Sequence, residues 1–161
     1  MNDMSKYFDE AIKMEINTAE MYLLFSQTLP KDKLFWWTLN LEEINHASLL
    51  ESEKLFYTVN AFPNELFSDD FDELAKLNDS FALKIEEFKK NPTRETAFTI
   101  ALDIENSGIE RNFQLLIENS TSNRAINLFK KLNRADKNHA KRIKDYMNGK
   151  AVFKTKVENK S

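Results

Sequence analysis

Two four-residue runs constrain this chain more than any other feature: EINH at residues 43–46 and DKNH at residues 136–139. In each run an acidic residue precedes a histidine by three positions, and the chain has no other histidine. Positions i and i+3 of a helix lie on the same face, so each run can present one carboxylate and one imidazole to the same point. The sequence therefore predicts two helices that each aim an acid–histidine pair at a common site.

Apolar residues flank both runs at helical spacing. The stripe through the first run contains Trp36, Leu39 and Leu50, and the stripe through the second contains Phe129, Leu132, Ile143 and Tyr146. The acid and the histidine thus interrupt the side of each helix that a bundle buries. A buried carboxylate is costly unless it is paired, protonated or bound to a metal. Two such pairs on facing helices favour a shared metal site.

Few residues that break helices interrupt the 161 residues of the chain, which include two glycines and three prolines. This composition favours long helices and a single all-α domain. We expect that domain to cover residues 1–149 and a polar, lysine-rich tail over residues 150–161 to be disordered. The apolar spacing, the prolines and the capping signal at Thr93 predict helices over residues 5–28, 32–57, 69–90 and 93–118, and a last one that ends near residue 147.

An internal repeat relates the two halves of the chain. A shift of 90 positions places Glu15 on Glu105, and a shift of 93 places His46 on His139. Each half therefore reads as a helix hairpin that contributes one lone glutamate and one acid–histidine pair. The connection over residues 58–92 is partly helical and long enough to run the length of a bundle. The predicted architecture is a four-helix bundle of two hairpins joined by a long crossover.

Two histidines and four carboxylates that converge from four helices form the ligand set of a dinuclear metal site. Oxygen ligands with one imidazole per metal suit iron or manganese better than zinc or copper. Four anionic ligands also neutralise two divalent ions. We therefore predict two bound iron ions, with manganese as the alternative. Glu43 and Asp136 are the predicted bridging ligands, and His46 and His139 each bind one metal. Glu15 and Glu105 are the predicted terminal ligands.

Simpler explanations exist for each part of this set when it is considered alone. A single histidine on an apolar stripe is more often a hydrogen-bonded core residue, and Glu15 or Glu105 alone could be a surface carboxylate. Tyr22 lies two turns after Glu15 on the same face and is the candidate catalytic residue, because its phenol could donate a proton or an electron at the metal site. A core tyrosine with a satisfied hydroxyl is equally compatible with that position.

Several other classes of function are excluded by composition. The net charge of −3 leaves no basic stripe, so nucleic acid is a poor partner. No stretch approaches 18 uninterrupted apolar residues and the N-terminus lacks the apolar segment of a signal peptide, so we expect a cytoplasmic protein with no membrane partner. The absence of cysteine excludes disulfides, thiolate catalysis and a cysteine-bound zinc or iron–sulfur centre.

The complete pattern resembles the rubrerythrin-like branch of the ferritin-like superfamily. It comprises AIKME ending at Glu15 with Tyr22 seven residues later, the EINH run, ALDIE ending at Glu105, and the DKNH run. The resemblance covers residues 5–147 and implies a ferritin-like fold. It also implies a di-iron oxidoreductase of the peroxidase or ferroxidase type that reacts with hydrogen peroxide or dioxygen, and a homodimer.

Three features depart from that family. Asp136 stands where the family has glutamate, and Gly108 stands where true rubrerythrins carry an additional glutamate. No cysteine-based rubredoxin module is present, so the resemblance implies a separate electron-donor protein. Two alternatives stay open: ferritin-type oxidation and storage of ferrous iron, against which the second histidine argues, and a helical interaction module without metal.

Overall fold

A computed structural model of the chain describes residues 3–59, 71–107, 127 and 138–149, and the regular structure within these ranges is entirely helical. The all-α prediction is therefore confirmed for this part of the chain. Residues 138–147 form a helical segment, and the four longer helices are α1 (Asp3–Thr28), α2 (Lys33–Val59), α3 (Phe71–Lys90) and α4 (Arg94–Glu105).

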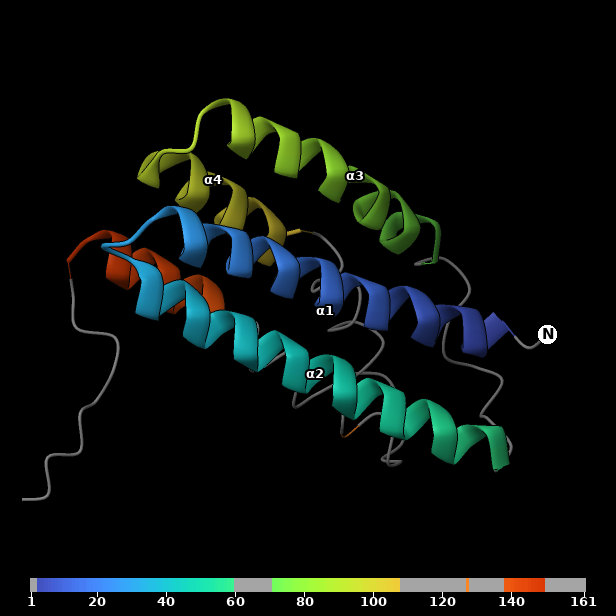
Figure 1. Ribbon diagram of the computed structural model, residues 1–161. Helices are drawn as coiled ribbons and strands as arrows, with labels where there is room; N and C mark the ends of the chain where they lie inside the picture. Colours follow the sequence, from blue (N-terminus) through green and yellow to red (C-terminus); the bar gives the residue numbers. More distant parts are fainter. Residues whose placement is uncertain (1–2, 60–70, 108–126, 128–137, 150–161) are drawn as a thin grey trace, which may run out of the picture.

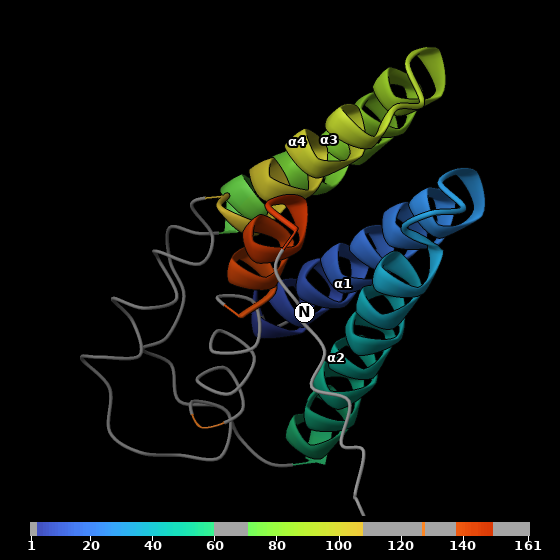
Figure 2. The ribbon, with the colours of Figure 1, turned by 90° about the vertical axis from the view of Figure 1, so that its left-hand side faces the viewer.

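The helices are arranged as two pairs. Helices α1 and α2 run antiparallel along each other, and α3 and α4 form the other pair (Figure 1). Helix α1 also packs against α3, which brings the pairs together. Turning the molecule shows that the 138–147 segment lies between the two pairs (Figure 2). None of the helices in the described ranges is long and apolar enough to span a bilayer.

An aromatic cluster joins the helices at one end of the molecule. The Phe25 ring of α1 contacts Trp36 of α2 at 5.1 Å and Phe88 of α3 at 4.6 Å between centroids. The Trp36 ring lies 5.0 Å from that of Phe98 in α4 and stacks on Tyr22 at 5.5 Å. All five of these aromatic side chains are buried. The cluster therefore fixes the helices relative to one another. Tyr22 is the member of the cluster nearest the predicted metal site.

A second set of contacts ties the start of α2 to α4 and to the 138–147 segment. Asp32 is buried and accepts hydrogen bonds from Arg94 Nε at 3.0 and 3.3 Å. The Arg94 guanidinium lies over the Phe98 ring, 4.5 Å from its centroid, while Tyr146 stacks on Phe35 at 3.9 Å. Burial of a carboxylate is tolerable here because the guanidinium pairs with it.

The ends of the helices follow local chemistry. Thr93 is the N-cap of α4, as predicted, and its hydroxyl oxygen accepts a hydrogen bond from the Thr96 amide at 3.2 Å. At the end of the 138–147 segment Gly149 adopts φ +76°, a left-handed conformation that glycine reaches without steric cost. The observed end of this segment at residue 147 agrees with the predicted end of the last helix.

The prediction that a helix continues from residue 93 to 118 is wrong, because α4 ends at Glu105. Asn106 Nδ2 donates to the Leu102 carbonyl at 2.5 Å, and Ser107 Oγ donates to the Ile104 carbonyl at 2.7 Å. The Asn106 amide still donates to the Leu102 carbonyl at 3.0 Å, as in a helix, but the Ser107 amide donates to the Ile104 carbonyl, three residues back, at 3.0 Å. The regular bonds to the fourth residue back therefore stop here, and the two side chains cap the last carbonyls. The remaining residues of that prediction, 108–118, lie outside the described part of the chain, as does the predicted tail.

Candidate metal centre

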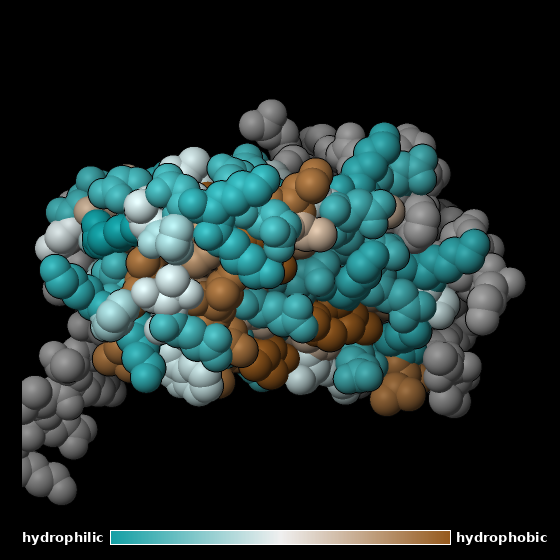
Figure 3. Space-filling view, turned by 45° about the horizontal axis from the view of Figure 1, so that its top comes forward, coloured by the Kyte–Doolittle hydropathy of each residue, from teal (hydrophilic) through white to brown (hydrophobic). Residues whose placement is uncertain are grey.

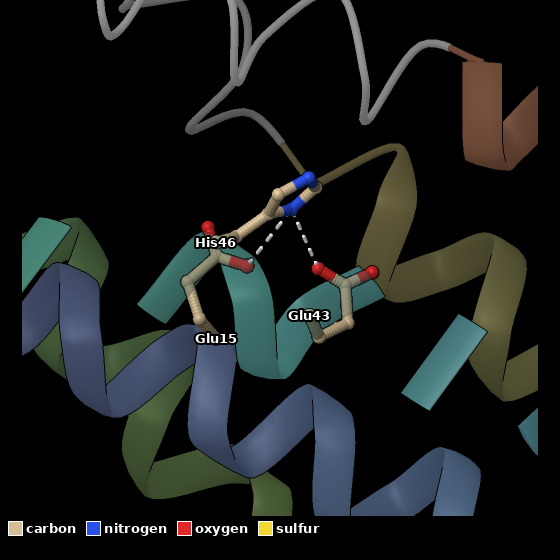
Figure 4. A group of neighbouring side chains, drawn as sticks. All are labelled: Glu15, Glu43 and His46. Carbon is tan, nitrogen blue, oxygen red and sulfur yellow. Dashed lines mark hydrogen bonds and ion pairs between the residues drawn. The ribbon is translucent and has the colours of Figure 1, made fainter. Parts of the chain in front are cut away.

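Three side chains from α1 and α2 form the first group. Glu15 lies on the face of α1 that packs against α2, and Glu43 and His46 lie one turn apart on α2. His46 Nδ1 is 3.0 Å from Glu43 Oε2 and 3.6 Å from Glu15 Oε2, so both carboxylates point to the same nitrogen (Figure 4). All three side chains are buried.

The second group joins α2 to α4 and to the 138–147 segment. His139 Nδ1 lies 2.8 Å from Glu43 Oε1 and 3.7 Å from Glu105 Oε1. These three residues are buried as well. Glu105 occupies the last turn of α4, so the early end of that helix still leaves its carboxylate inside the molecule.

Glu43 belongs to both groups. Its Oε2 faces His46 and its Oε1 faces His139, so one carboxylate stands between two imidazoles. The two imidazole rings are nearly parallel, at 16°, with centroids 5.5 Å apart. Within each group the potential ligand atoms lie within 4.8 Å of one another. This is the arrangement that a bridging carboxylate requires, with one histidine on either side.

Glu42, the neighbour of Glu43, binds the opposite edge of the His139 ring. Its Oε2 lies 2.7 Å from His139 Nε2 and accepts a hydrogen bond from Arg142 at 2.6 Å. His139 Nδ1 is buried and forms an ion pair with Glu43 Oε1 at 2.8 Å. The geometry of this pair is not that of a hydrogen bond, and Nδ1 has no hydrogen bond to any residue that the structure describes. The ring is thus held by Nε2 and presents Nδ1 to the carboxylates, as metal-binding histidines commonly do.

Burial and the nearby charge shift the protonation of the first group. Burial, together with the negative charge of Glu43, raises the pKa of Glu15 from 4.5 to about 8. Burial opposes the charged form of His46, but contacts with Glu15 and Glu43 outweigh it and raise the pKa of this imidazole to about 10. At neutral pH the metal-free group therefore holds a proton on Glu15 and a positive charge on His46.

The second group shows the same compensation. Burial opposes the charge on His139, yet Glu42 and Glu43 outweigh it and raise the pKa of this imidazole to about 11. Burial alone would raise the pKa of Glu43, but contacts with His139 and His46 hold it below its usual value. Glu42 likewise stays ionised, because His139 and Arg142 overcome its partial burial and lower its pKa. The positive charges of the two protonated imidazoles thus offset the negative charges of the buried carboxylates.

These buried glutamate and histidine groups could hold a metal ion. The donor atoms are carboxylate oxygens and imidazole nitrogens, with no sulfur, and the buried Nδ1 of His139 is aimed among them. A divalent cation could take the place of the protons described above, since deprotonated carboxylates and neutral imidazoles are the forms that bind metals. The residues present therefore fit one metal in each group, with Glu43 common to both.

Tyr22 lies at the edge of the second group. Its side chain is buried, and its hydroxyl donates a hydrogen bond to Glu105 Oε1 at 2.5 Å. Stacking on Trp36 holds the ring in place. The phenol thus contacts a residue of the candidate site directly, and the hydroxyl is also satisfied, so both sequence-based interpretations of Tyr22 stay open.

Five of the six predicted ligands come together in the structure: Glu15, Glu43, His46, Glu105 and His139. The sixth, Asp136, lies outside the described residues, and so does Gly108. Sequence reasoning missed Glu42 and Arg142, which position His139. Arg142 is three residues after His139, and this spacing could have suggested that it shares a partner with the histidine.

Comparison with known proteins gives no match: no family model, no curated protein and no solved structure is similar to this chain. The functional interpretation therefore depends on the geometry of the site and on the sequence pattern.

Proposed function

We propose that this protein is a rubrerythrin-like di-iron oxidoreductase, built on a ferritin-like four-helix bundle, that reduces hydrogen peroxide or dioxygen. The observation that carries the proposal is the position of Glu43, which offers one oxygen to each of two buried acid–histidine groups. A mononuclear site would not need two histidines on opposite sides of one carboxylate. Oxygen and imidazole donors in this ratio favour iron or manganese.

In this proposal Glu15 and His46 would hold one ion, Glu105 and His139 would hold the other, and Glu43 would be a ligand that both share, as the sequence also predicts for Asp136. The chemistry that a ferrous pair would supply at this site is the two electrons that, with two protons, convert hydrogen peroxide into two water molecules. Burial of the ligands limits the access of bulk water.

Tyr22 holds a proton close to the reaction site in this proposal. Its hydroxyl is 2.5 Å from Glu105 Oε1, so a proton can pass from the phenol to that carboxylate without rearrangement of the backbone. The chain has no cysteine for an iron–sulfur centre of its own, so electrons for repeated turnover come from a separate electron-donor protein. We expect Asp136 and Gly108, the departures from the family pattern, to make peroxide turnover slower than in a full rubrerythrin.

Anaerobic titration of the metal-free protein with Fe(II), followed by one equivalent of hydrogen peroxide, tests the proposal. Two ferrous ions should bind per chain, and one equivalent of peroxide should oxidise both. Glu105→Gln should lower the stoichiometry or the affinity, because it removes a charged ligand. Asp103→Asn makes the same chemical change two residues earlier on α4, at an exposed side chain, and should leave binding intact.

Two outcomes would contradict the proposal. Oxidation and retention of iron far beyond two ions per chain would favour ferritin-type storage. Failure to bind iron or manganese at all would favour a helical interaction module, in which the buried carboxylates and imidazoles serve only to pair with each other.

A further inference from the structure

Exposed lysines gather at the end of the molecule that holds the turn between α1 and α2 and the turn between α3 and α4. The last turn of the 138–147 segment lies at the same end, on the left in Figure 1. Among the described residues 27–34, 89–95 and 144–149, Glu95 is the one exposed acid. This end is therefore positive, although the net charge of the chain is −3. We call its five exposed lysines the basic end: Lys31, Lys33, Lys89, Lys90 and Lys144.

Exposed apolar side chains accompany these lysines. Leu34 is 71% exposed at the start of α2, and Met147 is 40% exposed at the end of the 138–147 segment. The half-buried Tyr146 stacks on Phe35, so this segment packs against the first turn of α2. Figure 3 shows hydrophilic side chains over much of this end of the molecule, on the left of the view. Apolar side chains among charged ones are typical of a surface that binds another protein.

Behind this surface, a continuous series of aromatic contacts leads to the candidate metal site. Tyr146 stacks on Phe35 at 3.9 Å between centroids, and the Phe35 ring lies 4.9 Å from that of Trp36. Trp36 stacks on Tyr22 at 5.5 Å, and the Tyr22 hydroxyl donates its hydrogen bond to Glu105 at 2.5 Å. The three inner rings are buried, so the series joins the surface to the site through side chains that exclude water.

The polar groups along this series differ between its two ends and its middle. Each tyrosine has a carboxylate nearby: Glu105 accepts from Tyr22, and the Asp32 carboxylate adds to burial in raising the pKa of Tyr146. Trp36 Nε1, in contrast, is buried and has no hydrogen-bond partner among the described residues. An oxidised phenol loses its proton, and here a carboxylate can take it, whereas an oxidised indole without an acceptor keeps its proton. Trp36 can therefore pass on an electron without moving a proton.

Packing alone does not account for an indole at position 36. A buried N–H group without a partner is costly, and an apolar aromatic ring in the same place would avoid that cost. Tyrosine and tryptophan are also the side chains of this chain that lose an electron most readily, since it has no cysteine. The order tyrosine, tryptophan, tyrosine therefore suits electron transfer between the surface and the site.

We propose that an acidic electron-donor protein docks on the basic end and that its electrons reach the candidate metal site through Tyr146, Trp36 and Tyr22. This inference rests on the proposed function, which places a strong oxidant, hydrogen peroxide, at the site and requires a separate electron donor. Complementary charge brings the donor to the surface where the aromatic series begins. Phe35 fills the space between Tyr146 and Trp36 and is not itself oxidised.

One electron moves along the series at a time. When hydrogen peroxide takes up two electrons and the site supplies only one, Tyr22 supplies the second, and its hydroxyl proton passes to Glu105. Trp36 then returns an electron to Tyr22, Tyr146 returns one to Trp36, and the donor returns one to Tyr146. Each side chain thus regains its electron and its proton. In net terms, one electron from the donor, one from the site and two protons from solvent break the O–O bond and give two water molecules.

Flash photolysis of the metal-free protein tests the aromatic series. The chain has no cysteine, so Met147→Cys provides a single attachment point beside Tyr146 for a ruthenium tris-bipyridine photo-oxidant. After a flash with a cobalt(III) ammine as electron acceptor, the oxidised ruthenium should take an electron from Tyr146 and, through it, from Trp36. The absorbance of a tryptophan radical should appear in Trp37→Phe and be lost in Trp36→Phe, the same change one residue earlier. Its decay should slow in Tyr22→Phe, which removes the next residue of the series.

Two results of this experiment would overturn the aromatic route: a tryptophan signal that survives Trp36→Phe, or one that is absent from Trp37→Phe. Because Trp36 is buried, Tyr146→Phe provides a second variant at a more exposed position that keeps the ring, and it should delay the oxidation of Trp36. Equal rates with and without the Tyr146 hydroxyl would also contradict the route. The experiment contains no metal, so its failure is distinct from failure of the Fe(II) titration, which tests the proposed function.

NMR with hexacyanochromate(III), a paramagnetic trianion that stands in for an acidic partner, tests the docking surface. The anion should broaden the amide signals of the basic end, and the double change Lys31→Glu and Lys33→Glu should remove the broadening around the start of α2. Lys76→Glu provides the control, since this exposed lysine on α3 lies fourteen residues before Lys90, or about 21 Å along the helix. It should leave the broadening unchanged. Broadening spread evenly over all exposed lysines, or broadening that survives the double change, would show that this end does not attract an acidic partner.

Discussion

Protons occupy the metal-free site at neutral pH, so metal binding should displace them. The pKa values of Glu15, His46 and His139 are raised to about 8, 10 and 11, all above 7. A carboxylic acid or an imidazolium becomes a ligand only after it loses a proton. Adding Mn(II), which binds without the oxidation that complicates Fe(II), should therefore release about three protons per chain when both groups fill at pH 7.

The same protons set the pH dependence of metal affinity. Each proton displaced strengthens binding about tenfold per pH unit, or about 1.4 kcal/mol. Glu15 should stop contributing to this pH dependence of metal affinity near pH 8, where it loses its proton. The two histidines should contribute until about pH 10. The combined binding constant for two ions should thus rise by about three decades per pH unit near pH 7 and by about two above pH 8.

Isothermal titration calorimetry in buffers of different ionisation enthalpy counts these protons directly. Glu15→Gln should release about one proton fewer than the wild type, while Glu20→Gln, an exposed amide substitution on the same helix, should change nothing. Metal binding that releases no protons at pH 7 would refute the reasoning, because the metal would then be held by groups other than these three.

Four further predictions concern Glu42, the Asp32 contacts and the metal-free fold. Glu42→Gln should weaken metal binding by about 10–100-fold, measured by competition with a chromophoric chelator, because a neutral amide holds the His139 ring less firmly through Nε2. Asp32→Asn should lower the free energy of unfolding by about 1–2 kcal/mol, since the bond to the half-exposed Arg94 loses its charge. The same change should lower the pKa of Tyr146, read from phenolate absorbance, because the Asp32 carboxylate adds to the effect of burial in raising it. Finally, the metal-free protein should melt at lower temperature as the pH rises from 6.5 to 8, and saturating Mn(II) should weaken or reverse that dependence. The raised pKa values mean that the folded state binds more protons than the unfolded chain in this interval, so stability is greatest below it and is lost as the pH climbs.

The sequence predicted the long helices closely, because their ends carry strong local signals. Expected bounds of 5–28, 32–57 and 69–90 lie within two residues of α1, α2 and α3. The end of α4 was missed because Asn106 and Ser107 were read as ordinary helical residues. Their side chains bind backbone carbonyls, and whether such residues end a helix depends on the packing around them, which the sequence does not display.

The convergence of the site was predictable for a different reason. The i, i+3 spacing in each acid–histidine run is a local property, and the repeat placed the lone glutamates on the remaining helices, so five ligands could be named without coordinates. Residues that position a ligand on another helix carry no such local signal in the sequence. Glu42 stands between the exposed Leu41 and the buried Glu43, and its half-exposed side chain reads as an ordinary surface acid until His139 and Arg142 are seen beside it.

The two groups of the candidate metal site are held in place by different contacts. The first group contains residues of α1 and α2 alone, two adjacent antiparallel helices. In the second group, His139 is held against α2 through Glu42 and Glu43, adjacent residues that grip opposite edges of one ring. Removal of Glu42 should therefore affect the second metal more than the first, because Glu42 binds the His139 ring, whereas Glu43 and Glu15 lie 3.0 and 3.6 Å from His46 Nδ1. A metal-binding isotherm that separates into a tight and a weak phase in Glu42→Gln, but not in Glu20→Gln, would locate the weaker ion at His139. Equal weakening of both phases would show instead that Glu42 acts on the whole of α2.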